Sequence, residues 1–247
     1  LLLDSNEKSN FYNHNPFFIP IMAGWKRQKF KFSNHGKSEI AYRAPCGRKL
    51  RSLDEVFKYI RITESTLDID YFTFSTGLKL YKTQNKLTVR YFIEDISNGL
   101  EPQPISCVNT IDDSVIEGVT YCNVRFMHEN LKFKIGQEFK SCCDCEDNCA
   151  NKITCPCQKL TYDMTDIAPR CQPAIAGYHY KRLYEFIVSG IFECNSNCKC
   201  NSRCPNKVVQ NGIRCRLQLF KTLNKGWGVR VLHDVPKGIL IKIPMNF

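Results

Sequence analysis

Most of the chain's cysteines lie in two short runs, and this clustering constrains the fold more than any other feature of the sequence. Residues 143–157 read CDCEDNCANKITCPC and residues 194–204 read CNSNCKCNSRC, which together hold nine of the fifteen cysteines. Closely spaced thiolates allow a short loop to supply several of the four ligands that a zinc ion binds in a tetrahedron. The two runs therefore predict a domain that is organised around metal ions.

Nine thiolates cannot be divided evenly among isolated four-coordinate sites. Three zinc ions need twelve thiolate bonds, and six terminal thiolates together with three bridging ones provide that number. Such a cluster would use every cysteine of the two runs: Cys143, Cys145, Cys149, Cys155, Cys157, Cys194, Cys198, Cys200 and Cys204. Its formal charge of −3 favours nearby cations, which the sequence supplies as Lys152, Lys159, Lys199, Arg203 and Lys207.

Two other uses of the cysteines are possible in principle. Disulfide pairing is disfavoured because the cysteine count is odd and the neighbours in a Cys-x-Cys step bridge poorly. A metal-storage protein fits the spacing, but such chains lack aromatic residues, which are abundant in the intervening segment GYHYKRLYEFIVSGIFE. We interpret the six cysteines outside the runs as packing thiols: Cys46, Cys107, Cys122, Cys142, Cys171 and Cys215.

The net charge of +11 is concentrated in two segments. Residues 24–51 hold nine lysines and arginines against one glutamate, and residues 207–242 hold eight against one aspartate. This distribution indicates a polyanionic partner, nucleic acid before membrane, although two solvated surfaces would give the same composition. No stretch approaches the roughly 20 apolar residues of a membrane span, and the N-terminal LLL is too short for a signal-peptide core. We therefore expect no membrane partner.

Three motifs together carry a resemblance to a known family. The two cysteine runs resemble the pre-SET module of SET-domain histone-lysine methyltransferases, and EDISNGLEPQPISCVNTID at 94–112 resembles the start of that module in the histone H3 lysine 9 class. Downstream, NKGWGVR at 224–230 resembles the first strand of a SET domain. The longer segment RLQLFKTLNKGWGVR and the long N-terminal region are similar to those of the SETDB family.

This resemblance implies an α+β fold. A small methyl-CpG-binding-type α/β sandwich would be followed by a zinc-cluster pre-SET module and by the start of an all-β SET domain. The implied order is an N-terminal arm, the methyl-CpG-binding-type domain, connecting strands, the pre-SET module and the incomplete SET domain, at 1–19, 20–76, 77–93, 94–206 and 207–247.

The SET resemblance also bears on cofactor and catalysis. In the family, a Gly-Trp-Gly segment lines the S-adenosylmethionine pocket, and Gly226, Trp227 and Gly228 match it. Relatives continue into a Tyr-x-Gly step and an Asn-His catalytic segment, whereas this sequence reads KIPMNF and stops. We therefore expect no catalytic residue in this chain and S-adenosylmethionine binding only in the complete enzyme.

The pattern between residues 20 and 76 resembles a methyl-CpG-binding domain. GWKRQKFKF at 24–32 and EIAYRAPCGRKLRS at 39–52 predict two strands, and SLDEVFKYI at 52–60 predicts a helix. Ser52 and Glu55 form a capping box, and apolar residues recur at the helical spacing after it. Aromatic residues at 68–74 are expected to pack on the sheet, and the alternating segment 75–92 predicts a hairpin.

The resemblance implies particular DNA contacts. Such domains read methyl-CpG with two arginines, each braced by a carboxylate, and Arg51 with Glu55 matches the second of these. The position of the first holds Phe32. We therefore expect contacts mainly to phosphates, from Arg27, Lys29 and Lys31 beside Arg51, with little methyl-CpG specificity.

Two hypotheses for function follow from the resemblance. The first is the chromatin-targeting and zinc-scaffold part of a nuclear, chromosome-bound enzyme that methylates lysine 9 of histone H3 with S-adenosylmethionine and represses transcription. The alternative is a non-enzymatic chromatin adaptor that binds DNA or a protein partner through the basic domain.

Overall fold

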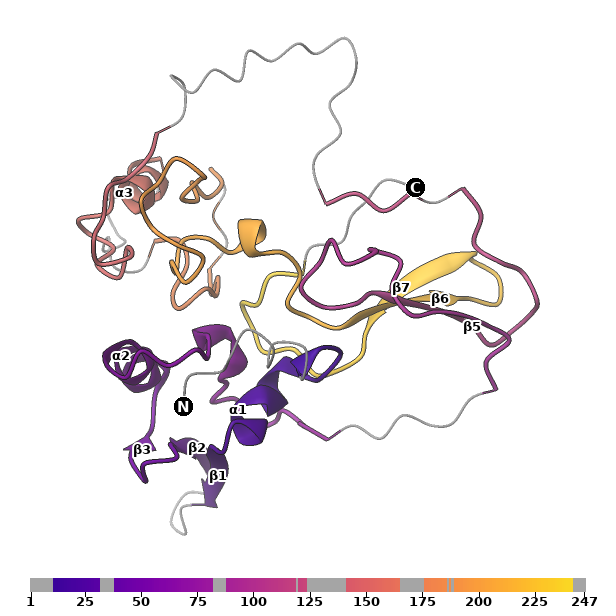
Figure 1. Ribbon diagram of the computed structural model, residues 1–247, viewed down its shortest axis with the longest axis horizontal. Coiled ribbons are helices and arrows are strands. Elements are labelled where there is room, and N and C mark those ends of the chain that lie inside the picture. The colour runs from indigo at the N-terminus through magenta and orange to yellow at the C-terminus, as the bar shows by residue number, and fades with distance from the viewer. Residues whose placement is uncertain are drawn as a thin grey trace. The chain divides into compact units, whose positions relative to one another are not determined.

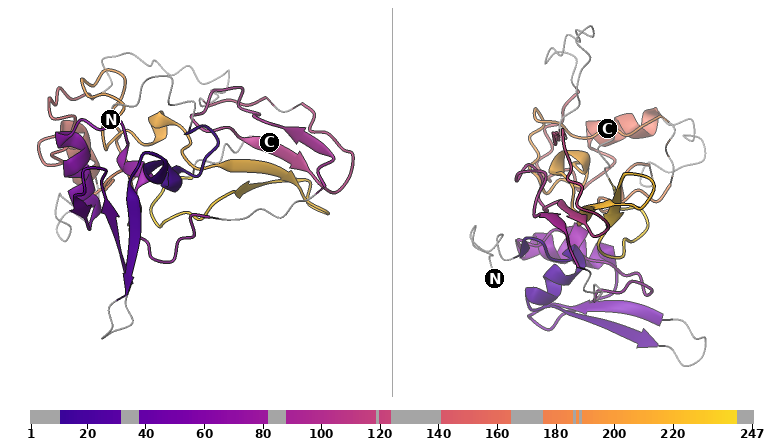
Figure 2. Two further views of the ribbon diagram at one scale, coloured as in Figure 1. Left: turned by 60° about the horizontal axis from the view of Figure 1, so that its bottom comes forward. Right: turned by 90° about the vertical axis from the view of Figure 1, so that its right-hand side faces the viewer.

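The computed structural model describes residues 11–31, 38–81, 88–118, 120–123, 141–164, 176–185, 187 and 189–241. They divide into two compact units, which Figure 1 and Figure 2 show in three views. The first unit comprises Leu1–Cys122, Ile213–Pro236 and Ile243–Phe247, and the second comprises Asn123–Gly212 and Lys237–Lys242. Helices and small sheets occur together, so the α+β fold class is confirmed.

The first unit begins with a three-stranded antiparallel sheet in the order β1-β2-β3. Its strands are β1 (Lys26–Lys31), β2 (Ser38–Arg43) and β3 (Lys49–Leu50), and the hairpin of β1 and β2 is clear in Figure 2. Short helices precede and follow the sheet: η2 (Pro16–Phe18), α1 (Ile19–Met22) and η3 (Ile69–Tyr71). The two strands predicted for this region are confirmed.

Helix α2 (Leu53–Ile62) begins at the predicted cap. The Ser52 side chain accepts a hydrogen bond of 3.1 Å from the Glu55 backbone N–H, which satisfies one of the helix's free donors. Glu55 Oε2 in turn accepts the Arg51 backbone N–H at 2.8 Å. Val56 and Ile60 are buried, as the helical spacing of the apolar residues predicts.

Three aromatic side chains form the centre of this core. The Phe72 ring lies edge-on to both Trp25 and Tyr42, with ring centroids 4.9 Å and 5.1 Å away. The Tyr42 hydroxyl donates to the Thr73 carbonyl oxygen at 3.3 Å and accepts the Thr73 N–H at 3.2 Å. The predicted packing of the 68–74 aromatics on the sheet is therefore confirmed.

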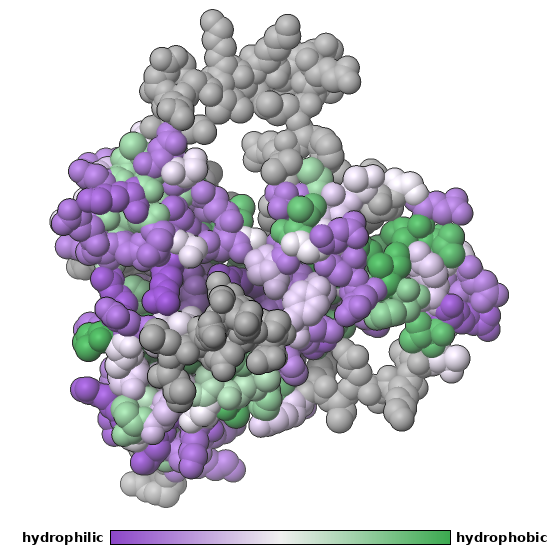
Figure 3. Space-filling model, viewed as in Figure 1, coloured by the Kyte–Doolittle hydropathy of each residue, from purple (hydrophilic) through white to green (hydrophobic). Residues whose placement is uncertain are grey.

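A second sheet in the first unit has the order β4-β5-β6-β7. Strands β5 and β6 pair in parallel, and the other two pairs are antiparallel. The strands are β4 (Tyr91–Ile93), β5 (Ser106–Asn109), β6 (Leu217–Lys221) and β7 (Trp227–Val231). In the surface view of Figure 3, hydrophobic residues gather over this sheet, whereas hydrophilic residues predominate elsewhere.

The hairpin predicted for 75–92 is wrong for the residues that are described there. Residues 75–81 and 88–90 form no strand, and β4 pairs with β5 instead. Alternating hydrophobicity identifies a strand but not its partner, and here the partner lies beyond the Asp95 turn. The Asp95 carboxylate holds that turn by accepting the N–H groups of Ser97, Gly99 and Ile105.

The described part of the second unit contains helix α3 (Pro156–Asp163), the short η5 (Val209–Asn211) and no β-sheet. Its buried core is a group of eight cysteines. A core of this kind has little apolar surface to bury, which is typical of domains that metal ions hold together.

Several predicted features lie outside the described residues: Phe32, Cys171, the first ten residues of the arm and residues 242–247. Among the helices that are described, none has both the length and the apolar character needed to cross a bilayer.

Candidate metal centre

The two cysteine runs meet in one buried cluster. Eight of the nine predicted ligands are buried there, and Cys145 packs against them from a half-buried position. All nine residues lie in the described part of the second unit, and contacts between the runs join residues far apart in sequence, such as Cys157 and Cys198, which are 41 residues apart. The structure therefore brings together the full set that the spacing predicted.

The first run reaches the cluster through a tight turn and a helix start. Asn148 and Cys149 adopt φ angles of +55° and +59°, and the Asp147 carboxylate holds the turn by accepting the Cys149 and Asn151 N–H groups. Cys155 is the N-cap residue of α3, and Pro156 begins the helix, where its missing N–H costs nothing.

The second run folds as consecutive asparagine turns. The Asn195 side chain accepts the Asn197 N–H at 2.9 Å, and the Asn201 side chain accepts the Arg203 N–H at 2.9 Å. Asn148 and Asn201 then join the two runs, since each side chain bonds to the other residue. These asparagines are positioning residues that the cysteine spacing alone could not assign.

The distances between sulfur atoms fit tetrahedral zinc coordination. Zinc–sulfur bonds of about 2.3 Å place the corners of a tetrahedron about 3.8 Å apart. Among the observed Sγ–Sγ distances are 3.8 Å from Cys194 to both Cys143 and Cys149, 3.7 Å between Cys157 and Cys198, and a shorter 3.5 Å between Cys143 and Cys149. The sulfur atoms are thus already spaced as ligands of shared ions.

Three groups of four sulfur atoms can each surround one ion. They are Cys143, Cys149, Cys155 and Cys194; Cys143, Cys157, Cys194 and Cys198; and Cys149, Cys194, Cys200 and Cys204. Within each group, all sulfur atoms lie within 4.8 Å of one another. Cys143, Cys149 and Cys194 belong to more than one group, whereas the other members belong to one.

Burial makes Cys143 and Cys157 poor acids in the absence of a cation, whereas hydrogen bonds to the sulfur atoms lower the pKa of Cys155 and Cys204. Desolvation raises the pKa of the Cys157 thiol to about 12 and also raises the pKa of Cys143. A bound divalent cation stabilises the thiolate form and reverses this effect. Backbone N–H groups are already directed at two sulfur atoms, from Asn195 to Cys198 and from Asn206 to Cys204, both at 3.3 Å.

The cations predicted to offset the charge of the cysteine cluster differ in their partners. Lys207 donates to the Cys200 carbonyl oxygen at 2.7 Å, and its positive charge opposes the rise in the pKa of Cys200 that burial causes. Lys159 and Lys199 instead pair with Asp163 and Glu146. Sequence reasoning missed Lys181, which is buried in this unit and directs its ammonium group at the Ser202 carbonyl oxygen.

The cysteines outside the runs divide by exposure. Cys107 and Cys215 are buried in the first unit, as predicted for packing thiols, and burial raises the pKa of Cys215 to about 11. Cys46 and Cys142 are exposed, so the packing interpretation is wrong for them. Cys142 directly precedes Cys143 of the buried cluster, and a local pattern does not reveal which of two neighbouring side chains faces inward.

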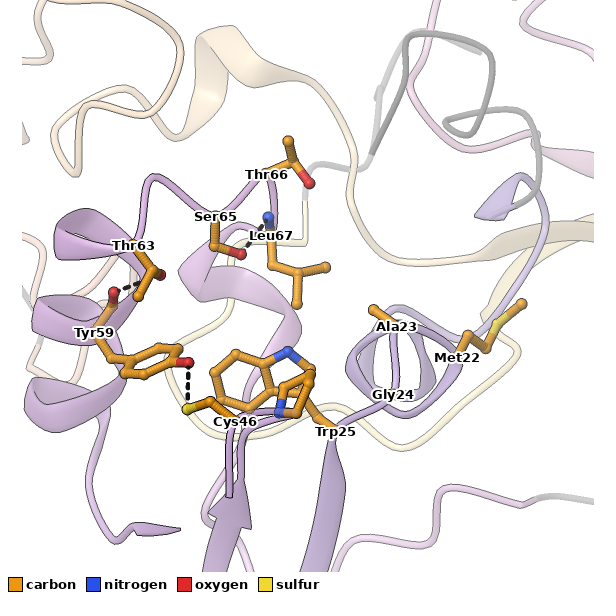
Figure 4. A pocket seen from close by; sticks show the side chains of 11 residues that line it. Met22, Ala23, Gly24, Trp25, Cys46, Tyr59, Thr63, Ser65, Thr66 and Leu67 are labelled. Atoms are coloured by element: carbon orange, nitrogen blue, oxygen red, sulfur yellow. Dashed lines mark hydrogen bonds between the residues drawn. The ribbon is translucent and has the colours of Figure 1, made fainter. Parts of the chain in front are cut away.

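Cys46 lies at a pocket of the methyl-CpG-binding-type domain. The pocket has a volume of about 570 Å³ and is walled by Trp25, Tyr59 and Leu67 among others (Figure 4). Cys46 Sγ is 3.0 Å from the Tyr59 hydroxyl, a hydrogen bond that lowers the pKa of Cys46. This thiol is remote in sequence from the cysteine runs and is absent from the sulfur groups above.

The predicted cofactor segment forms a turn and a strand. Gly226 has a φ of +68° in the turn between β6 and β7, where its carbonyl oxygen accepts the Thr222 N–H at 2.8 Å. Gly228 lies against the Phe220 ring, and a Cβ at this glycine would come within 3.2 Å of that ring. Trp227 is half-buried at the start of β7. The local conformation of the segment is therefore set by its own hairpin.

Of the predicted DNA contacts, Arg27, Lys29 and Lys31 lie on one face of the first sheet, and Arg51 follows β3. Arg27 donates to the carbonyl oxygens of Thr73 and Ser75, and Lys29 donates to that of Thr76. Lys31 and Arg51 are exposed, and the Arg51 guanidinium has no partner among the described residues.

Register places other cations on the opposite face. Arg27 and Lys29 pair with Tyr42 and Ile40 on the core face, so Lys26, Arg43 and Lys49 point the other way. Lys49 Nζ lies 3.7 Å from the centre of the Phe30 ring on that face. The composition of the strand predicted its positive charge. It could not predict which of the cationic side chains form hydrogen bonds within the domain, as those of Arg27 and Lys29 do.

Two family models match the chain. Residues 97–207 match the Pre-SET motif and residues 13–81 match the methyl-CpG binding domain, against expected ranges of 94–206 and 20–76. The matches follow the order of the expected modules.

Curated relatives are similar over nearly the whole chain. It is 39% identical over 232 residues to histone-lysine N-methyltransferase eggless of Drosophila melanogaster, and 39% identical over 236 residues to histone-lysine N-methyltransferase SETDB2 of Mus musculus. These alignments cover 94% and 93% of this chain but 18% and 32% of the relatives. The chain thus spans about a third or less of their length.

A solved structure of KRYPTONITE in complex with mCHH DNA, an H3(1-15) peptide and SAH is also similar. Its sequence identity is 23% and its TM-score is 0.47, over 87% of this chain and 37% of that chain.

Proposed function

We propose that this chain, which belongs to the SETDB family of histone-lysine methyltransferases, is the chromatin-targeting and zinc-scaffold part of such an enzyme. The observation that carries the proposal is the buried cluster of pre-SET cysteines, which lies in the same chain as a methyl-CpG binding domain. The complete protein would methylate lysine 9 of histone H3 on nuclear chromatin.

The cysteine cluster would hold three zinc ions, and the sulfur groups suggest how they are shared. One ion would take Cys157 and Cys198 as terminal ligands, and a second would take Cys200 and Cys204. The third ion would take Cys155 as one terminal ligand. Its second terminal ligand would be Cys145, which packs against the cluster. Cys194, Cys143 and Cys149 would then each bridge a different pair of ions.

Zinc would have a structural role at this site. Four thiolates fill the coordination sphere of each ion, so no open position remains to activate water or a substrate. The ions would link the turn at Asp147, the start of α3 and the second cysteine run, which no sheet joins in the described part of this unit. We propose no catalytic residue in this chain.

Four exposed cations of the methyl-CpG-binding-type domain, which we call its basic face, would contact DNA phosphates. They are Lys26, Lys31, Arg43 and Arg51. Lys31 and Arg51 are exposed, and Lys26 and Arg43 are exposed on the face that is turned away from Phe72 and Tyr42. Arg27 and Lys29 would add positive potential while their side chains hold residues 73–76. Arg51 would be the only base-reading arginine among the cations named, which argues for weak methyl-CpG specificity.

The complete protein tests this proposal directly. It should transfer methyl groups from S-adenosylmethionine to histone H3, whereas the 247-residue chain should show no turnover with labelled cofactor. Gly226, Trp227 and Gly228 form only one wall of a cofactor pocket, and an unclosed pocket binds weakly. Turnover by the chain alone, or an inactive complete protein, would contradict the assignment and favour the chromatin adaptor.

A further inference from the structure

The strand hairpin β6–β7 begins beside a largely buried arginine. Arg214 lies just before β6, and its Nη1 donates to the Tyr71 hydroxyl at 3.0 Å. Its Nη2 lies 3.7 Å from Asp68 Oδ2, and the two side chains are only 27% and 14% exposed. Tyr71 and Asp68 belong to η3 and its N-cap, so this contact joins the methyl-CpG-binding-type domain to the second sheet.

A second contact near the start of β6 uses the N-terminal end of the same domain. Arg216 Nε donates to Asn13 Oδ1 at 3.0 Å. The Asn13 backbone N–H also donates to Gln103 Oε1 at 3.2 Å, beside the start of β5. These partners are separated by 203 and 90 residues, so the contacts are set by tertiary packing alone.

The end of the hairpin is held by other residues of that domain. Asp234, which follows β7, accepts the Lys79 backbone N–H at 2.9 Å through Oδ2. The adjacent His233 packs edge-on against the Phe17 ring with centroids 5.7 Å apart. His233 Nε2 also accepts the Arg216 N–H at 3.2 Å, which ties the two ends of the hairpin together.

The energetic weight of these contacts differs. A charge pair that is mostly shielded from water is costly to break from one side, because the remaining charge loses its counter-ion. Asp68 and Arg214 form such a pair, whereas the ion pair of Asp54 and Lys58 on α2 is exposed and contributes little. The arginine contact should therefore dominate the docking.

We infer that the methyl-CpG-binding-type domain docks on the β6–β7 hairpin through Asp68, Tyr71 and Asn13. The domain thereby fixes the position of the Gly226–Gly228 turn. Asp68 and Tyr71 act as positioning residues, since they hold Arg214 at the entrance to the hairpin. A ligand that displaces this domain loosens the hairpin, and a ligand that stabilises the docked form tightens it.

Hydrogen exchange on the intact chain tests the docking. Asp68→Asn should speed amide exchange in β6 and β7 by about tenfold, because docking should contribute roughly 1.4 kcal/mol or more to closing the hairpin. Tyr71→Phe should give a smaller change in the same peptides. Peptides of α2 should keep their wild-type exchange in both variants.

Asp54→Asn is the matched control, since it removes a carboxylate from the same domain but from an exposed ion pair. It should leave the exchange of β6 and β7 unchanged. Unchanged exchange in β6 and β7 for both Asp68→Asn and Tyr71→Phe would overturn the inference. Equal acceleration in every peptide of the first unit would also overturn it, because that result indicates a general loss of stability.

In the complete protein, the consequence for cofactor binding rests on the proposed function. Asp68→Asn should raise the KM for S-adenosylmethionine several-fold more than it lowers kcat, because Asp68 positions the pocket wall and does not touch the reacting atoms. A change in kcat alone would contradict a positioning role. An inactive wild-type protein would reject the proposed function and leave the exchange result standing.

Discussion

Cys143, Cys149 and Cys194 differ from the other cluster cysteines because each belongs to more than one group of four sulfur atoms. Spacing selected the nine cysteines that the structure gathers in one cluster, since each run is a local pattern. It could not predict which cysteines belong to more than one sulfur group, because this depends on how the two runs fold onto each other. Cys142 shows the same limit, since its exposure could not be read from its neighbours.

Substitution of single cysteines tests these roles. Cys194→Ala should remove ligands from two ions and abolish soluble zinc-bound protein, because structural zinc binding contributes about 10–16 kcal/mol per ion. Cys198→Ala removes a terminal ligand and should leave a destabilised protein that has lost about one ion. Zinc content and soluble yield measure both effects.

Cys142→Ser is the control for these variants, because this side chain is exposed beside the cluster but belongs to none of its sulfur groups. It should retain the wild-type zinc content. An equal loss of zinc and of soluble yield in Cys142→Ser and Cys194→Ala would contradict the assignment of Cys194 as a ligand and Cys142 as a non-ligand.

Asp112 provides a prediction on pH. Hydrogen bonds from Ser114 and Asn109 lower the pKa of this carboxyl to about 2 from an ordinary value of 3.8. Because the folded pKa is depressed, the carboxylate stabilises the 109–114 turn above pH 3.8, and this effect is lost as pH falls towards 2. An NMR titration of the Asp112 carboxyl carbon should have its midpoint near pH 2. A midpoint near 3.8 would show that these bonds do not form in solution.

At the scale of elements, local patterns predicted α2 and two strands of the first sheet, β1 and β2, but not the short β3. The Ser52 cap and the apolar stripe depend only on neighbouring residues, so the sequence contains the information for them. The second sheet is different, because β5 pairs with a strand more than 100 residues later. The 75–92 hairpin was wrong, for the residues described on either side of 82–87, because the alternation carried no information on pairing.

The cations on the first sheet also predict the salt dependence and the sequence preference of DNA binding. Affinity should fall steeply with salt, with a log–log slope near −0.9 for each phosphate that the basic face neutralises. Methylated and unmethylated CpG duplexes should bind within about tenfold of each other, because one arginine makes only half of a symmetric readout. Fluorescence anisotropy at several salt concentrations measures both quantities.

Arg51→Ala should weaken binding to both duplexes about equally. The comparison variant Arg27→Ala should mainly lower the melting temperature, because Arg27 holds the Thr73 and Ser75 carbonyl groups. A larger preference for the methylated duplex that disappears in Arg51→Ala would refute phosphate-dominated binding. Absence of binding to either duplex at low salt would assign the face to a protein partner.

At the scale of the whole molecule, the two units are stabilised by different means. The first unit has two sheets and an aromatic core around Phe72, so its stability should come from strand pairing and apolar burial. The described part of the second unit has a cysteine core and no sheet, so its stability should depend on bound zinc. The spacing of the cysteines predicts a metal dependence, and the cysteine cluster lies in the second unit alone, so we expect the dependence to be confined to that unit.

The zinc content of the purified chain tests the central claim most directly. Elemental analysis together with hydrogen exchange should give three zinc ions per chain, and a strong chelator should expose the amides of α3 while those of α2 stay protected. The nine thiolates reach full coordination only when three of them are shared, so the number of ions reports the shared cluster itself. One or two ions per chain, or an α3 that stays protected after chelation, would contradict this account.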